Sequence, residues 1–299
     1  MSDNIPNEVV MEILGRLPVK TLLRFSLYLW NPSIRKFVVL PRPRITCSSH
    51  GFDYYRVLGF GFDSTTNDYK VVRIVYISGG TEVDIYSLKE GDWRRISVSG
   101  PVPRIDCDPS HAYVNGTIHW VTRGRNCHNF IVLFNLGTKV FSQMELPTSL
   151  QRSIAQIGQP RSLSLAVFQD SLCVFQSDSY NRKASIWMMK EYCVVESWTN
   201  LFNLDYSREF PLREEFGVVD PWANLFTYFS SRSALSVRVI GLKRNGEVLL
   251  VKDEKMISVD IKAQTFRYLG ISGREAAFSV NTYTESLVLI DKASGLQEG

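Results

Sequence analysis

The sequence has few cysteines and no long apolar run. Its 299 residues include five cysteines, an odd number, and none of them forms a C-x-x-C pair. This usage is typical of buried free thiols in a reducing compartment and argues against a disulfide framework. No apolar run approaches the roughly 20 residues of a membrane-spanning helix, and the N-terminus lacks the basic start and apolar stretch of a signal peptide. We therefore expect a cytosolic protein, with the nucleus as a second compartment, and no membrane partner.

Neither sign of charge is in large excess. The formal net charge is +4, and basic residues occur at most in adjacent pairs such as Arg94-Arg95 and Lys243-Arg244. Proteins that bind nucleic acid or anionic membranes usually carry longer basic runs or patches. We expect no nucleic-acid partner.

Catalytic motifs are absent from the sequence. It contains no G-x-S-x-G, no H-E-x-x-H and no phosphate-binding P-loop. Gly59-Phe60-Gly61 begins like a dinucleotide-binding fingerprint, but Ser64 occupies the third glycine position and a strand pattern follows from Tyr69. We interpret the two glycines as allowing a strand to bend beside bulky phenylalanines. The sequence therefore predicts a protein without catalytic activity and without a cofactor.

A zinc site is the metal centre that the sequence could most readily suggest. Three cysteine–histidine pairs have suitable residue types: Cys47 and His50, Cys107 and His111, and Cys127 and His128. Zinc needs four convergent ligands, and no C-x-x-C anchors this set. We favour core thiols and loop histidines, and we predict no metal.

From Leu29 onward the sequence is dominated by strand patterns. Short runs of β-branched and aromatic residues alternate with Gly, Asn, Asp, Pro and Ser. The predicted strands include Val57–Phe62, Tyr69–Ile77, Thr81–Tyr86, Thr117–Thr122, Phe130–Asn135, Ser171–Gln176, Glu247–Val251 and Met256–Ile261. Asn115-Gly116 and Asn245-Gly246 predict type I′ hairpin turns. Helical patterns are sparse here, and we expect Met188–Val195 to be mostly strand or turn.

A weak internal repeat underlies these strands. In each copy, a strand ends at polar residues and a turn follows. A second strand then leads to an aromatic residue or to Leu-Pro. Copies begin near Leu29, Val83, Leu133, Ile186 and Val259. A period of roughly 50 residues is within the range of propeller blades. We predict a mainly β fold, a kelch-like β-propeller, complete or incomplete, with a β-sandwich as the alternative.

The strongest helical pattern is at the N-terminus, in Ile5–Phe25. Apolar residues at Val9, Ile13 and Leu17 and their neighbours form one stripe along a helix. Pro6 suits the first turn of this helix, and Pro18 ends it and can open a second one. Two helices this short cannot form a core alone, so we expect them to need a partner surface.

This segment resembles the F-box, the adaptor-docking motif of SCF-type ubiquitin ligases. The resemblance rests on Ile5-Pro6, Leu17-Pro18-Val19-Lys20 and Leu22-Leu23-Arg24-Phe25. It implies docking on a Skp-type adaptor, and through it on a cullin-based ligase. The implied docking residues are Ile5, Pro6, Val9, Val10, Ile13, Leu14, Leu17, Pro18, Leu22, Leu23 and Phe25. Family members continue with a Cys- and Trp-containing third helix, whereas this chain passes directly into Ser26–Pro32. The F-box is therefore interpreted as truncated after Phe25.

The remaining sequence resembles the plant F-box-associated domain, which has a kelch-like propeller architecture. The matching motifs are Leu29–Pro32, Gly59–Asp63 with Asp68–Val72, and Val114–Trp120. Asn281–Val288 is similar to the S-locus F-box subgroup, whose members act in pollen self-incompatibility and recognise S-ribonucleases. The implied organisation is an F-box remnant in residues 1–26, a propeller-like domain in 27–292 and a tail in 293–299.

The resemblance implies a substrate-recognition subunit, so a face for a target protein is expected on the propeller loops. Candidate loops are polar and aromatic: residues 48–56, 103–111, 124–129 and 206–224. Their candidate contact residues are Arg123, Arg125, Arg208, Arg213 and Trp222, which would suit an acidic partner, although solvated arginines without a partner explain them equally well. Two other functions stay open. One is a protein-binding module that has lost adaptor docking, and the other is a propeller enzyme or lectin with an axial pocket.

Overall fold

The computed structural model of the protein describes thirteen stretches of the chain. They are residues 27–41, 43, 55–77, 80–98, 102–105, 111–123, 128–155, 162–178, 183–205, 237–243, 245–252, 254–260 and 265–273. The predicted F-box remnant in residues 1–26 and the predicted tail in 293–299 lie outside these ranges.

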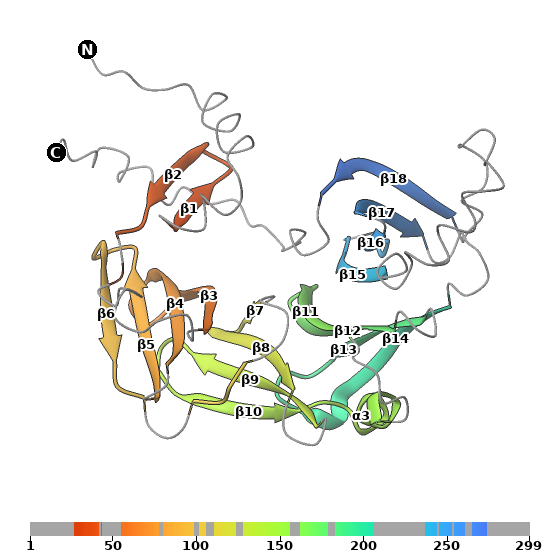
Figure 1. Cartoon of the computed structure of the whole chain (residues 1–299), viewed down its shortest axis with the longest axis horizontal. Coiled ribbons are helices and arrows are strands. Elements are labelled where there is room, and N and C mark those ends of the chain that lie inside the picture. Colours follow the sequence, from red (N-terminus) through yellow and green to blue (C-terminus); the bar gives the residue numbers. More distant parts are fainter. Residues whose placement is uncertain are drawn as a thin grey trace, which may run out of the picture. The chain divides into compact units, whose positions relative to one another are not determined.

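The described residues are mainly β-strands (Figure 1). The first half of the chain contains β1 (Tyr28–Asn31), β2 (Lys36–Val39), β3 (Tyr55–Asp63), β4 (Asp68–Ile77), β5 (Gly80–Ser87), β6 (Asp92–Ile96), β7 (His111–Val114), β8 (Thr117–Arg123), β9 (Asn129–Asn135) and β10 (Phe141–Glu145). The second half contains β11 (Ser162–Phe168), β12 (Ser171–Asp178), β13 (Lys183–Met189), β14 (Trp198–Asp205), β15 (Val237–Leu242), β16 (Val248–Lys252), β17 (Lys255–Asp260) and β18 (Thr265–Ser272). Every strand predicted above overlaps one of these.

Within the described ranges, two short helices accompany the strands. The α-helix α3 (Thr148–Ala155) follows Pro147, and the 3-10 helix η3 (Val195–Ser197) lies before β14. Sequence analysis did not identify α3, although Pro147 directly before Thr148 is a helix-start signal. Among the described helices, none is long and apolar enough to cross a membrane.

The sheets repeat one pattern. The described ranges contain four sheets of four strands, and each takes its strands in chain order. β1 and β2 form a separate two-stranded sheet, here called the ribbon. Consecutive antiparallel strands in four-stranded units are the construction of propeller blades, so the predicted kelch-like propeller architecture is confirmed.

One of the two predicted type I′ turns is confirmed and the other is wrong. Asn115 and Gly116 have φ angles of 50° and 72°, and two positive values define a type I′ turn. At the second site Gly246 has a φ of 87°, but Asn245 is not among the residues with positive φ. Hydrogen bonds from Gly246 N to Lys243 O and from Lys243 N to Glu247 O close a longer connection instead. Asn245 there uses its side chain, accepting from Glu247 N.

The chain forms two compact units, and each is described by itself. One unit contains the ribbon and β4, β5 and β6, and the other contains most of β3 and β7 to β18. In the larger unit, the first strands of three sheets are neighbours, because β11 contacts both β7 and β15. Such contact between the first strands of successive sheets is expected for adjacent propeller blades.

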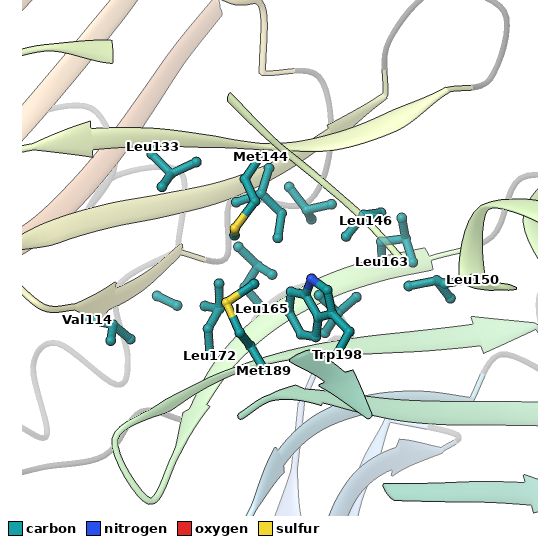
Figure 2. Packing of buried hydrophobic residues seen from close by; sticks show 14 residues of the cluster. Val114, Leu133, Met144, Leu146, Leu150, Leu163, Leu165, Leu172, Met189 and Trp198 are labelled. Carbon is teal, nitrogen blue, oxygen red and sulfur yellow. The ribbon is translucent and has the colours of Figure 1, made fainter. Parts of the chain in front are cut away.

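The cores of the larger unit lie between neighbouring sheets. Figure 2 shows one of them, in which Leu133 and Met144 face Leu165, Leu172 and others across the gap between two sheets. Leu150 brings α3 into the same cluster. A second cluster joins β11–β14 to β15–β18 in the same way. These three sheets therefore bury their apolar faces against one another, as adjacent propeller blades do.

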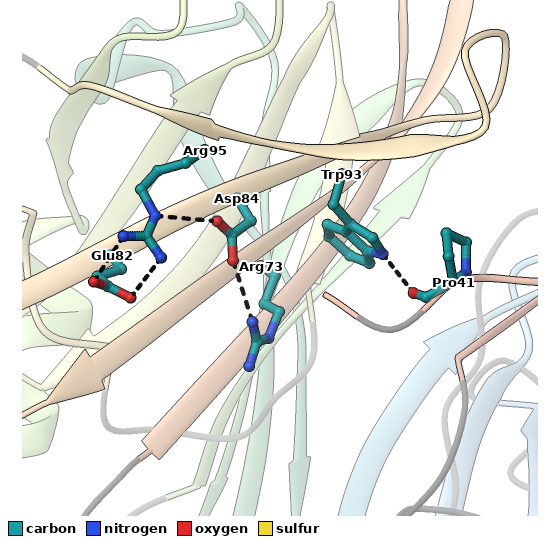
Figure 3. Close-up of polar contacts among 6 residues, drawn as sticks. All are labelled: Pro41, Arg73, Glu82, Asp84, Trp93 and Arg95. Atoms are coloured by element: carbon teal, nitrogen blue, oxygen red, sulfur yellow. Dashed lines mark hydrogen bonds and ion pairs between the residues drawn. The ribbon is translucent and has the colours of Figure 1, made fainter. Parts of the chain in front are cut away.

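The ribbon is anchored to the β4–β6 sheet of the smaller unit. Leu29 and Val38 pack on a cluster that includes Tyr86 and Trp93. The Trp93 indole N–H also donates a hydrogen bond of 2.8 Å to the carbonyl of Pro41, shortly after β2 (Figure 3). The inward face of the ribbon is therefore part of the core.

The Gly59-Phe60-Gly61 motif has a different role from the one predicted. An added Cβ at Gly59 would lie 2.5 Å from Cζ2 of Trp120, and one at Gly61 would overlap the ring of Tyr113. Phe60 between them is 38% exposed. The glycines thus admit a tryptophan and a tyrosine from the β7–β8 hairpin, and the interpretation based on phenylalanines is wrong.

Candidate protein-interaction surfaces

Most predicted contact residues lie outside the described part of the chain. This holds for Ile5, Pro6, Val9, Val10, Ile13, Leu14, Leu17, Pro18, Leu22, Leu23 and Phe25 and for Arg125, Arg208, Arg213 and Trp222. Arg123 is the last residue of β8. The predicted roles of these residues remain predictions.

Arg123 lies at one end of the β7–β10 sheet, here called the loop end. Because neighbouring strands are antiparallel, the start of β7, the end of β8, the start of β9 and the end of β10 all lie there. Two of the predicted loops, 103–111 and 124–129, adjoin this end. The fold therefore brings these two candidate segments to the same edge of one sheet.

Side-chain hydrogen bonds support the backbone of the loop end. The Thr122 hydroxyl donates to the carbonyl of Arg104 at 2.8 Å. Gln151 of α3 bonds the backbone of Asn129 twice, accepting from its N–H at 3.3 Å and donating to its carbonyl. A loop surface supported this way on a sheet is a suitable place for a binding face, because less ordering is needed when a partner docks.

The charges at the loop end are of both signs. His128 Nε2 lies 2.6 Å from Glu145 Oε2, and both side chains are 56% exposed. An exposed pair of this kind contributes little to stability. Sequence analysis missed Glu145, because the strand that carries it is distant in sequence from the candidate arginines.

A second surface is the outward face of the ribbon. Cross-strand partners share a face, and the register pairs Tyr28 with Val39 and Trp30 with Phe37. Trp30 is 58% exposed and Val39 is 49% exposed. Large apolar side chains exposed together on a small sheet are typical of a surface that another segment covers.

A buried histidine–tyrosine pair joins two sheets. His119 of β8 is fully buried; its Nδ1 lies 3.3 Å from the carbonyl of Ala112 and its Nε2 lies 3.1 Å from the hydroxyl of Tyr192. A carbonyl only accepts, so Nδ1 carries the hydrogen and Nε2 accepts from Tyr192. Burial lowers the pKa of His119 to about 4 and raises that of Tyr192 to about 12. Both groups stay neutral at pH 7, and their role is structural.

This pair predicts acid sensitivity. In the unfolded chain the His119 imidazole has its ordinary pKa of 6.5, whereas in the folded protein its pKa is about 4. The contribution of this residue to the free energy of unfolding is therefore intact above pH 6.5. As the pH falls from 6.5 to 4, the free energy of unfolding decreases by on the order of 3 kcal/mol, because the unfolded chain takes up the proton first. Urea unfolding at pH 7.5 and 4.5 should show a smaller loss for His119→Gln than for wild type. Equal losses would contradict this assignment.

No group of three or more His, Cys, Asp or Glu side chains is placed to hold a metal ion within the described stretches. His111 Nε2 accepts a hydrogen bond of 3.2 Å from Phe60 N, which is a structural role.

The two described cysteines differ in burial. Cys173 is buried, and its burial raises the thiol pKa to about 12. Cys193 is exposed, because it lies in the turn after β13, so the expectation of buried thiols is wrong there.

Two family models match the sequence. The model described as F-box associated beta propeller domain matches residues 19–290. The model described as F-box domain matches residues 2–27. The two matches overlap over residues 19–27, so no additional sequence separates the two regions.

Individual proteins also match the chain. F-box protein CPR1 of Arabidopsis thaliana is 26% identical over 292 residues, which are 88% of this chain and 64% of that protein. F-box protein At3g07870 of Arabidopsis thaliana is 28% identical over 91% of this chain and 67% of that protein. The chain thus spans about two thirds of the length of these relatives. Among solved structures, TolB from Acinetobacter baumannii has a TM-score of 0.43, with 8% identity over 84% of this chain and 50% of that one.

Proposed function

The chain belongs to the F-box associated β-propeller family, and from this we propose that it is a substrate-recognition subunit of an SCF-type ubiquitin ligase. The N-terminal segment docks on a Skp-type adaptor, and the β domain holds a target protein near the ligase. The chain itself makes and breaks no bond. It acts by raising the effective concentration of the target at the catalytic partners.

The observation that carries this proposal is the direct junction of an F-box match to a propeller match on one chain. The apolar stripe of the F-box segment needs a partner surface, as its composition indicates. The sheets of the larger unit bury their apolar faces against each other. Their connecting loops are then available for a target, and the loop end of β7–β10 is the described region that adjoins two candidate loops.

Affinity purification from plant cells tests the docking. Wild type should recover the adaptor and the cullin, whereas Ile13→Asp or Leu17→Asp should lower adaptor recovery more than tenfold, because a charge would be buried in an apolar contact. The β domain should stay folded, as shown by an unchanged circular dichroism spectrum. If the variants recover as much adaptor as wild type, docking through the stripe is wrong.

For the target we propose an S-ribonuclease in pollen self-incompatibility, bound through Arg123, Arg125, Arg208, Arg213 and Trp222. The support is the similarity of Asn281–Val288 to the S-locus subgroup. In the same purification, Arg123→Glu with Arg125→Glu should lower recovery of the target and leave the adaptor unchanged. Recovery of other targets only, with no ribonuclease, would contradict this identification.

A second candidate function is a binding module that no longer docks on an adaptor. The lack of the Cys- and Trp-containing third F-box helix after Phe25, where the sequence passes directly into Ser26–Pro32, favours it. Recovery of a target without adaptor or cullin in the wild-type purification would select this function.

A further inference from the structure

The sequence contains two Asn-Gly steps, and both lie in exposed turns. Asn115-Gly116 joins β7 to β8, and Asn245-Gly246 lies between β15 and β16. Both asparagines are exposed, and a Cβ added to either glycine would meet nothing within 4 Å. Because both steps are open to solvent and sterically unhindered, a difference in their reactivity has to come from their hydrogen bonds.

An Asn-Gly step can lose the side-chain amide nitrogen of the asparagine. The backbone nitrogen of the glycine attacks the asparagine Cγ, a new C–N bond forms, and the side-chain nitrogen leaves as ammonia with the proton of the attacking nitrogen. Water then opens the cyclic imide at either of its carbonyls, which gives aspartate or isoaspartate. Glycine favours the attack, because it has no Cβ to obstruct the approach and leaves the backbone its widest freedom.

Both reacting groups are held by hydrogen bonds at Asn245-Gly246. Asn245 Oδ1 accepts a hydrogen bond of 3.1 Å from Glu247 N, and Asn245 Nδ2 donates one of 2.8 Å to Glu247 Oε1. The attacking nitrogen, Gly246 N, donates a hydrogen bond of 2.8 Å to the carbonyl of Lys243. These bonds oppose the rotation that would bring Gly246 N onto the Asn245 Cγ, and each adds its own net free energy to the barrier.

The same groups are not held at Asn115-Gly116. Among the residues that the structure describes, neither the Asn115 side-chain amide nor Gly116 N has a hydrogen-bond partner. Asn115 is bonded through its backbone carbonyl, which accepts from the Thr117 hydroxyl at 3.3 Å. We propose that Asn115 is a site of deamidation in the folded protein and that its products include isoaspartate, whereas the turn at Asn245 protects that residue. The proposal does not depend on the proposed function.

Isoaspartate at this site alters a hairpin that holds β3. The turn has positive φ at both of its central residues, 50° and 72°, and isoaspartate adds a carbon to the main chain there, which disturbs the register of β7 with β8. Gly116 O also accepts a hydrogen bond of 3.0 Å from Leu136 N. Trp120 and Tyr113 of the same hairpin donate to carbonyls of β3. Aspartate tolerates the left-handed conformation, so isoaspartate should weaken the hairpin more than aspartate does.

Incubation of the purified full chain at mildly alkaline pH, followed by peptide mapping with mass spectrometry, tests the proposal. In the folded protein, deamidation at Asn115 should be about tenfold faster than at Asn245, since one net hydrogen bond corresponds to a factor of up to about this size. In urea the two sites should react at similar rates, because both are then unrestrained Asn-Gly steps. An isoaspartyl-directed methyltransferase with a labelled methyl donor identifies isoaspartate, because it does not methylate ordinary aspartate.

Two variants test the cause of the difference. Glu247→Ala removes the acceptor of Asn245 Nδ2, so it should raise the rate at Asn245 about fivefold and leave the rate at Asn115 unchanged. Asn115→Asp should abolish the rapid release of ammonia and the methyltransferase labelling of this peptide.

Equal rates at the two sites of the folded protein, faster reaction at Asn245, or reaction at Asn115 only in urea would overturn the proposal. An unchanged rate at Asn245 in Glu247→Ala would show that its hydrogen bonds do not protect it. None of these readouts uses an adaptor or a target, so they stand whether or not the chain docks on a ligase.

Discussion

Replacing Asp84 by asparagine should lower the free energy of unfolding by about 3–5 kcal/mol. Asp84 of β5 lies between two arginines on neighbouring strands, in register with Arg73 of β4 and Arg95 of β6. Arg73 Nη1 lies 3.1 Å from Asp84 Oδ2, and their side chains are 4% and 6% exposed (Figure 3). Burial raises the pKa of the Asp84 carboxyl above its ordinary value, and the two arginines partly offset this. Asparagine can still accept a hydrogen bond from Arg73, but it carries no negative charge to offset that of the buried guanidinium.

Two companion variants separate this effect from a general loss of charge. Glu82→Gln breaks a two-bond pair with Arg95 whose side chains are 25% and 54% exposed, so it should cost less than about 1 kcal/mol. Arg73→Leu combined with Asp84→Leu should recover much of the loss, because neither charge is then buried. Chemical denaturation measures all three. Equal decreases in the free energy of unfolding for Asp84→Asn and Glu82→Gln would contradict the claim that burial makes the Asp84 ion pair more important for stability than the exposed one.

Replacing Trp120 by alanine should cost about 3–5 kcal/mol. Trp120 of β8 is fully buried, and its indole N–H donates a hydrogen bond of 2.9 Å to the carbonyl of Leu58 in β3. The missing side chain at Gly59 makes room for its ring. The substitution would leave a cavity and would remove the indole donor to the Leu58 carbonyl.

The control for Trp120→Ala is Tyr268→Ala, an aromatic residue on β18 that is 40% exposed. It contacts Phe266 edge-on and lies under the Lys255 amine, so its loss should cost about 1 kcal/mol or less. Thermal and urea unfolding compare the two. Similar losses would mean that Trp120 does not hold β3 against the hairpin.

Much of the fold could be predicted from local sequence, because strands and turns are encoded over a few residues. The run of β-branched and aromatic residues in Tyr69–Ile77 corresponds to β4, and Asn115-Gly116 forms the expected type I′ turn. The propeller repeat was detectable because each sheet takes its strands in chain order. The turn at Asn245 was mispredicted because an alternative asparagine hydrogen bond is available there.

The rest depends on contacts between residues distant in sequence. The reason for Gly59 is Trp120, and the partner of buried His119 is Tyr192, 73 positions later. Nothing in the local pattern around either residue reveals such a neighbour. The same applies to Asp84, because its pattern does not distinguish a buried carboxylate from a solvated one.

Some residues of the candidate interaction surfaces could also be predicted from local sequence, whereas their positions in the fold could not. The apolar stripe with Ile13 and Leu17 is recognisable from spacing alone, and Arg123 could be named from composition. The position of Arg123 at the loop end, near the supporting contacts of Gln151 and Asn129, required the pairing of β8 with β9. The exposed Trp30 could not be predicted, because strand alternation does not say which face of a ribbon packs inward.

The most direct test of the account is a calorimetric titration of the purified chain with a purified Skp-type adaptor. The account predicts saturable one-to-one binding that Ile13→Asp removes and that Ile271→Thr, which changes an exposed apolar residue on β18 (50% exposed), leaves unchanged. Absence of binding by the wild-type chain, or equal binding by wild type and Ile13→Asp, would contradict the claim that the N-terminal stripe docks this protein on a ligase.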